Sequence, residues 1–295
     1  MSDQYSFSQH QTQDGVILPQ VLNRCPPGTK AHVLCVGYLQ ADAGFFLRGG
    51  NTSTYSNPDG PSKHERRDLV MYVVLIDHPS EGLILYETGC GYDYPNVWPS
   101  AVHDVFHRSK YLPEHELDTA IAKVGYNIKD VKMVIIGHLH LDHAGGLDKF
   151  KGTDVPIWVH KEELLSGFYS VATGADAGVY LPTYMTTDYN WKTFDERTTD
   201  LAQGLTLHHL PGHTAGLCGL QINLINSGTY IFVSDHGHVK ENIWQGVPQG
   251  WLARDHQAWF NSNQRLLRME KTMGAKIIPG HDEDIATPLF GKVLT

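Results

Sequence analysis

Histidine is the residue type that first points to chemistry in this chain, because 18 of its 295 residues are histidines. Imidazole is the commonest metal ligand in proteins, so the spacing of these histidines shows what the chain can bind. The densest group lies in residues 138–143 (HLHLDH), where four potential ligands fall within six positions. By chance, the pattern H-x-H-x-D-H is expected in about one of two hundred chains of this composition. The segment therefore predicts a metal site.

Three further segments end an apolar run in a potential ligand. His213 follows LTLHHL, Asp235 follows TYIFV, and His281 follows AKII, in each case within three residues. By itself, each of these residues is more often a structural polar group than a ligand. Together with residues 138–143 they provide five histidines and two aspartates. That set suits two divalent cations with nitrogen and oxygen ligands, zinc foremost.

Short apolar runs bounded by turn residues predict the strands that position these ligands. The runs lie at 31–39, 68–77, 82–87, 131–136, 156–160, 205–210, 219–224, 229–233 and 275–278, and helical patterns cover 113–124 and 252–273. The strands form two groups, each followed by helical residues, without the regular alternation of a barrel. We therefore expect an α/β fold with two sheets in a single domain over residues 1–295, with the polar loops at the carboxyl ends of the strands.

Residues 167–199 differ from the rest of the chain in composition. They are rich in glycine, alanine and threonine, and they carry seven aromatic side chains. Long irregular segments inside a domain commonly form lids or binding loops. We expect a cap over a substrate pocket, in which Tyr184 and Trp191 contact the substrate. A loop that packs on its own aromatic residues is the alternative.

Composition excludes several classes of protein. The net charge of −9 (23 basic against 32 acidic residues) argues against a nucleic-acid-binding surface. No run approaches the roughly 18 apolar residues of a membrane-spanning helix, and residues 1–10 lack the basic and apolar regions of a signal peptide. The four cysteines form no C-x-x-C pair, which predicts reduced thiols. We expect a cytoplasmic protein without a nucleic-acid or membrane partner.

The order of the ligands, H-x-H-x-D-H and then His, Asp and His, resembles the metallo-β-lactamase superfamily over residues 31–281. The resemblance implies an αβ/βα sandwich, in which two mixed sheets flanked by helices hold a binuclear site between them. It also implies a role for each ligand: His138, His140 and His213 for the first metal, Asp142, His143 and His281 for the second, and Asp235 as the bridge. Glu87 lies in an E-T-G sequence where relatives have D-T-G, and it would orient the metal ligands without binding the metal itself.

Within that superfamily, the forms HLHLDHAGG and PGHTAG are most similar to the N-acyl homoserine lactonases, which are quorum-quenching enzymes. The resemblance implies two Zn²⁺ per chain, with iron, manganese or cobalt as alternatives. Two such cations can share a bridging hydroxide at neutral pH, and Asp142 would carry a proton to the leaving group. The expected substrate is a small cyclic ester. A lactam or cyclic carbamate hydrolase, a glyoxalase II-like thioester hydrolase and an iron oxidoreductase are the alternatives.

His238 marks a departure from the lactonase pattern, because those enzymes commonly carry a tyrosine three residues after the bridging aspartate. A neutral imidazole can still donate a hydrogen bond to a developing oxyanion. We therefore expect His238 to bind substrate and to take part in catalysis, and a bystander role is the alternative for both His236 and His238. The sequence leaves the assembly open, and a homodimer is compatible with it.

Overall fold

The predicted strands and helices are largely present in the computed structural model, which describes residues 5–11, 17–60, 64–176 and 178–295. Its strands are β1 (Tyr5–Gln11), β2 (Ile17–Asn23), β3 (Lys30–Asp42), β4 (Arg66–His78), β5 (Gly82–Tyr86), β6 (His107–Lys110), β7 (Val131–Ile135), β8 (Pro156–His160), β9 (Asn190–Phe194), β10 (Thr198–Ala202), β11 (Leu205–His209), β12 (Cys218–Leu224), β13 (Gly228–Phe232), β14 (Lys276–Ile278) and β15 (Val293–Leu294). Its α-helices are α1 (Ala43–Phe46), α2 (Tyr94–Val97), α3 (Ser100–Val105), α4 (Leu117–Lys123), α5 (Leu141–Ala144), α6 (Lys161–Thr173), α7 (Lys240–Trp244), α8 (His256–Met273) and α9 (Glu283–Ala286).

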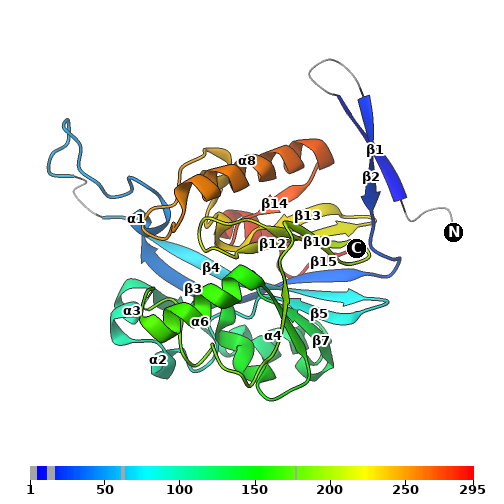
Figure 1. The fold of residues 1–295 in the computed structure, drawn as a ribbon, viewed down its shortest axis with the longest axis horizontal. Helices are drawn as coiled ribbons and strands as arrows, with labels where there is room; N and C mark the ends of the chain where they lie inside the picture. Colours follow the sequence, from blue (N-terminus) through cyan, green and yellow to red (C-terminus); the bar gives the residue numbers. More distant parts are fainter. Residues whose placement is uncertain (1–4, 12–16, 61–63, 177) are drawn as a thin grey trace.

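Two mixed sheets face each other at the centre of the molecule. The larger one has the strand order β15-β3-β4-β5-β7-β8-β9, with β6 also paired to β3. Its first strands are antiparallel, and β5, β7, β8 and β9 are parallel. The smaller sheet has the order β10-β11-β12-β13-β14 and ends in a parallel β13–β14 pair. Strands β1 and β2 pair only with each other among the described residues, and this hairpin stands to one side of the sheets (Figure 1).

The sequence of β4 shows why the layers stack as they do. Leu69, Met71, Val73 and Leu75 pack in a core on one face of the sheet. The alternate residues Val70, Tyr72, Val74 and Ile76 pack in the core between the two sheets. Successive side chains of a strand point to opposite faces, so a continuous apolar run fits a strand that is covered on both sides. This is the reason that residues 68–77 contain so few polar positions.

Helices cover the outer face of each sheet, which confirms the predicted αβ/βα sandwich (Figure 1). Helix α8 packs its buried Leu266 against the small sheet in a third core with Ile231 and Ile277. This helix starts four residues later than its apolar pattern predicts, because the side chain of Asp255 accepts a hydrogen bond from the Ala258 amide and caps it there. The helix predicted over 113–124 is likewise a 3-10 turn followed by α4.

The expectation of a long irregular cap over residues 167–199 is wrong in its extent. Helix α6 continues to Thr173 and ends at Gly174, which has φ +73°. Turns occupy the described residues between 174 and 189, and β9 then extends the larger sheet. The second half of α6 (SGFYSVAT) is rich in small residues, which hides its helical pattern. The His160 side chain caps the start of the helix by accepting a hydrogen bond from the Glu162 amide. Within the described ranges, no helix combines the length and apolar character that crossing a bilayer requires.

Candidate metal centre

The carboxylate of Asp235 lies at the centre of the ligands that the sequence singles out. It follows β13, and its two oxygens face different imidazoles. Oδ1 lies 2.9 Å from His281 Nε2 and 3.1 Å from His143 Nε2. Oδ2 lies 3.4 Å from His213 Nε2 and 3.7 Å from His138 Nε2. One carboxylate therefore connects two groups of histidines.

Each group forms a compact set of possible ligands. The first set is His138, His140 and His213, and the second is Asp142, His143, Asp235 and His281; within each set the ligand atoms lie within 4.8 Å of one another. In the first set, His213 Nε2 is 3.0 Å from His140 Nδ1. In the second, Asp142 Oδ2 is 3.5 Å from His281 Nε2. The structure thus brings together all seven residues that the sequence predicts as metal ligands.

Polar contacts on the far side of four rings determine which nitrogen faces the cluster. Each contact is made by an Nδ1 atom. His138 Nδ1 lies 3.2 Å from Ser234 Oγ, and His143 Nδ1 lies 3.2 Å from Glu87 Oε1. His213 Nδ1 lies 3.1 Å from Gln249 Oε1, and His281 Nδ1 lies 3.0 Å from the Val70 carbonyl oxygen. Such outer partners orient the rings of metal-binding histidines. All four leave Nε2 directed at the centre of the site.

Glu87 lies where the sequence predicts an orienting carboxylate. Its Oε1 accepts a hydrogen bond of 2.7 Å from Ser234 Oγ, and Oε2 accepts one of 3.2 Å from the Gly137 amide. Glu87 therefore contacts the loop before His138, the turn before Asp235 and the ring of His143. It adopts a φ of +64°, a conformation that costs a non-glycine residue about 1–3 kcal/mol and is found mainly where the surroundings hold it.

Burial and charge divide the histidines into two kinds. Burial lowers the pKa of His138, His140 and His213 well below the ordinary value, so these rings are neutral, which is the form that binds metals. Burial, the largest single effect, would lower the pKa of His143 and His281, but the carboxylates of Asp235 and Asp142 together outweigh it and raise both values.

Unpartnered atoms show that the cluster fits divalent cations. His138 Nε2, His143 Nε2 and Asp235 Oδ1 face one another in the cluster and are buried without a hydrogen-bond partner among the described residues. A buried polar atom without a partner costs roughly 1–3 kcal/mol, and several atoms that converge on one point need a common partner. Neutral imidazoles and carboxylates are the ligands that zinc and similar cations take.

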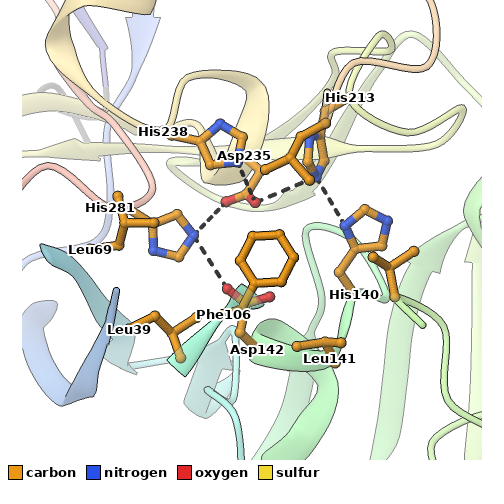
Figure 2. Close-up of a pocket in the computed structure, with 12 residues that line it drawn as sticks. Leu39, Leu69, Phe106, His140, Leu141, Asp142, His213, Asp235, His238 and His281 are labelled. Carbon is orange, nitrogen blue, oxygen red and sulfur yellow. Dashed lines mark hydrogen bonds and ion pairs between the residues drawn. The ribbon is translucent and has the colours of Figure 1, made fainter. Parts of the chain in front are cut away.

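A cavity that is open to solvent adjoins this cluster. Figure 2 shows imidazoles, carboxylates and apolar side chains that together surround it. The polar residues are His140, Asp142, His213, Asp235, His238 and His281, and the apolar ones are Leu39, Leu69, Phe106, Leu141, Val179 and Leu252. Sites for small organic molecules commonly combine an apolar wall with a few placed polar groups.

Comparison with known families agrees with this geometry. The model of the family described as the metallo-beta-lactamase superfamily matches residues 67–281. The chain belongs to the metallo-beta-lactamase superfamily. Its similar proteins include an N-acyl homoserine lactonase from a Bacillus species, which is 30% identical over 222 residues, or 74% of this chain and 83% of that protein. The N-acyl homoserine lactonase AiiB of Agrobacterium fabrum is 23% identical over 269 residues, or 87% of this chain and 95% of that protein.

Solved structures show the same superfamily fold. An N-acyl homoserine lactone hydrolase with N-hexanoyl-L-homoserine bound at its catalytic metal centre superposes with a TM-score of 0.74 at 23% identity, covering 90% of this chain and 98% of that one. The dizinc quorum-quenching lactonase AidC superposes with a TM-score of 0.62 at 16% identity, covering 95% and 92%. The shared fold confirms that the two sheets and their helices are arranged as in other metallo-beta-lactamase proteins.

The expected substrate contacts of Tyr184 and Trp191 are not found, because neither side chain lines the cavity of this metallo-beta-lactamase fold. The hydroxyl of Tyr184 accepts a hydrogen bond from Trp98 Nε1, and its ring is buried in the core. Trp191 lies on β9, where its Nε1 donates to the Thr186 carbonyl. The segment between α6 and β9 contributes Val179 to the cavity wall instead.

Glu163 is the main site residue that the sequence analysis misses. It lies in the first turn of α6 with none of its surface exposed. Its carboxylate accepts hydrogen bonds from three segments: the Leu139 amide at 2.9 Å, the Tyr180 hydroxyl at 2.9 Å, the Thr214 hydroxyl at 2.5 Å and the Gly216 amide at 3.2 Å. An acidic residue in a first helical turn is so common that its sequence position gives no sign of this role.

Proposed function

We propose that this protein is a metal-dependent hydrolase that opens a small cyclic ester of the N-acyl homoserine lactone type. The observation that carries the proposal is the cluster of convergent, unpartnered imidazole and carboxylate atoms at the polar side of an otherwise apolar cavity. The similar proteins named as N-acyl homoserine lactonases support the reaction and the substrate class.

The donor set suggests how two cations, which we propose to be zinc, would be held. His138, His140 and His213 would bind one, Asp142, His143 and His281 the other, and Asp235 would bind both. When bound, such cations lower the pKa of water and polarise a carbonyl group. The burial that keeps the rings of the first set neutral leaves them ready to bind without first losing a proton.

Asp142 is the member of the cluster that is suited to move a proton. It is only partly buried, whereas the other members of its set are buried, and it lines the cavity. We propose that its carboxylate carries a proton to the oxygen that leaves when the ring opens. His143 and His281 lie 3.6 Å and 3.5 Å from its Oδ2, so this carboxylate is held in place at the bottom of the cavity.

The apolar wall would bind the acyl part of the substrate and keep bulk water away from the reacting ester. Phe106 and Leu252 come from segments far apart in the sequence and meet at the cavity, together with Leu39 and Leu69 of the larger sheet. An acyl chain would bury apolar area there, worth roughly 25 cal/mol per Å². His238 also lines the cavity and is the candidate for a polar contact with the substrate.

A hydrolysis panel on metal-loaded protein tests the proposal. Short-chain and long-chain acyl homoserine lactones, γ-lactones, an aromatic lactam, a cyclic carbamate and a thioester would be compared, with elemental analysis of the same sample. We expect lactone turnover by protein that contains about two divalent ions per chain. His138→Ala should lose both metal and turnover. Turnover confined to the lactam or carbamate would replace the substrate class, and full activity in metal-free protein would refute the proposed function.

A further inference from the structure

His238 contacts the cluster as closely as the predicted ligands do. Its Nε2 lies 3.1 Å from Asp235 Oδ2, the same oxygen that His213 Nε2 approaches at 3.4 Å. The ligand atoms of His213, Asp235 and His238 lie within 4.8 Å of one another. In Figure 2 the Nε2 edge of this ring points at Asp235, and Nδ1 points away from the cavity. The ring thus lies next to His213 of the first set and next to the carboxylate that connects the two sets.

The ring of His238 is buried, and neither of its nitrogens has a hydrogen-bond partner among the described residues. Most buried polar side-chain atoms have a partner, and one that lacks it calls for an explanation. The ion-pair contact with Asp235 leaves Nε2 facing the same space as the unpartnered Nε2 of His138. A cation held by the first set would satisfy both atoms.

His238 also differs from the other histidines in how it is held. The rings of His138, His143, His213 and His281 each have a partner on Nδ1, whereas Nδ1 of His238 has none. Packing fixes it instead: the ring lies 5.6 Å from the His281 ring at an interplanar angle of 23°, and 6.0 Å from the Phe46 ring. A ligand without an outer hydrogen bond is a weaker and more easily displaced ligand.

We propose that His238 is an additional, displaceable ligand of the cation held by His138, His140 and His213. This inference rests on the proposed metal-dependent function, but it concerns how the cation is bound rather than which substrate is cleaved. The nitrogen that would contact a substrate is the same Nε2 that faces the cluster. In the absence of substrate, this nitrogen would therefore be available to bind the metal. The site then offers eight ligands in place of the seven predicted from the sequence.

His236 provides a matched control two residues away. It is also fully buried, and both of its ring nitrogens lack partners. Its ring stacks on Trp259, however, at 5.8 Å and 17°, and it belongs to none of the groups of possible ligands found among the described residues. If loss of a buried imidazole from this turn weakens metal binding through the fold, substitution of either histidine should weaken it. If His238 binds the metal directly, only its substitution should do so.

The test uses cobalt(II)-loaded full-length protein and does not depend on turnover. Wild type, His238→Ala, His238→Phe, His236→Ala and His138→Ala would be compared by competition with a chelator, by visible absorption of the bound cobalt, and by X-ray absorption as a count of coordinated imidazoles. The phenylalanine variant keeps a ring against Phe46 and His281, so it separates loss of a ligand from loss of packing. We expect both His238 variants to bind one cobalt at least about tenfold more weakly, with an altered spectrum, and added imidazole to restore the spectrum of His238→Ala.

His236→Ala should keep the wild-type affinity and spectrum. Unchanged affinity, spectrum and imidazole count in His238→Phe would overturn the proposal, and so would equal changes in His236→Ala. The His138→Ala protein separates this failure from a failure of the metal centre. If His138→Ala also binds cobalt as the wild type does, the proposed function itself is refuted.

Discussion

Glu163 offers a sharp test of how the site is held together. One carboxylate connects the residue between His138 and His140, through the Leu139 amide, to the residues after His213, through Thr214 and Gly216. It therefore fixes the distance between the two loops that carry the first set of ligands. We predict that replacing it destabilises the protein and weakens metal binding together.

The expected magnitude follows from the hydrogen bonds of each oxygen. Oε1 accepts from the Leu139 amide and the Tyr180 hydroxyl, and Oε2 accepts from the Thr214 hydroxyl and the Gly216 amide. In Glu163→Gln the NH₂ group faces one backbone N–H and one hydroxyl whichever way the amide turns. The hydroxyl can rotate to accept, but the backbone N–H cannot. One buried donor is left unsatisfied, which costs about 1–3 kcal/mol. Glu163→Ala leaves all four donors without this acceptor and should therefore cost more than Glu163→Gln, because each buried donor left unsatisfied adds about 1–3 kcal/mol.

Urea unfolding and metal retention after dialysis against a chelator would measure both effects. Glu162→Gln is the matched control, because Glu162 is exposed in the same helical turn. We expect Glu163→Gln to be less stable and to retain less metal than Glu162→Gln, and Glu163→Ala to show larger losses of both stability and metal. Equal stability and equal metal retention in Glu163→Gln and Glu162→Gln would refute the proposal that Glu163 holds the two ligand loops together. Lower stability with unchanged metal retention would show that Glu163 supports the fold alone.

Three further outcomes are expected. Asp235→Asn should reduce kcat by at least about a hundredfold while the fold survives, as circular dichroism would show; near-native turnover would exclude a bridging carboxylate. Phe106→Ala should raise KM for long acyl chains by about tenfold through lost apolar contact, whereas Tyr184→Ala should lower thermal stability without changing KM. Burial and the neighbouring His209 ring lower the pKa of His160 to about 4, so folding favours the neutral ring. The contribution of this neutral ring to the free energy of unfolding is therefore complete above about pH 6.5 and is lost as the pH falls towards 4. His160→Asn, which can still cap α6, should reduce that acid loss in urea titrations at several pH values.

The metal centre could be predicted from the sequence because its ligands obey a local rule. Each of them lies within eight residues of the end of an apolar strand, and strand ends meet at one edge of a sheet. Residues 138–143 alone supply four potential ligands, and the continuous apolar run of β4 predicts burial on both faces, which the two cores confirm. Patterns of this kind can be read from the sequence because they depend only on neighbours along the chain.

The cavity wall could not be predicted in the same way. Leu39, Leu69, Phe106 and Val179 come from four separate segments, and nothing along the chain marks them as neighbours. Most of the aromatic residues of 167–199 are at least partly buried, as their type suggests, but residues buried in a core and residues buried against a ligand have the same composition. Tyr184 belongs to the core, where its hydroxyl accepts from Trp98. Contact partners, rather than residue types, separate the two cases.

The different positions of His236 and His238 could not be predicted from the sequence. Both follow the bridging aspartate in the sequence DHGH, and both rings are buried without partners. The difference arises from the turn: residues Ser234–His236 form a 3-10 turn that carries His236 to Trp259, and the extended Gly237 then returns the chain so that His238 faces Asp235. A side chain on Gly237 would collide with Ile243, at 2.4 Å. The glycine therefore allows the chain to pack closely at the point where it directs His238, and not His236, towards the metal ligands.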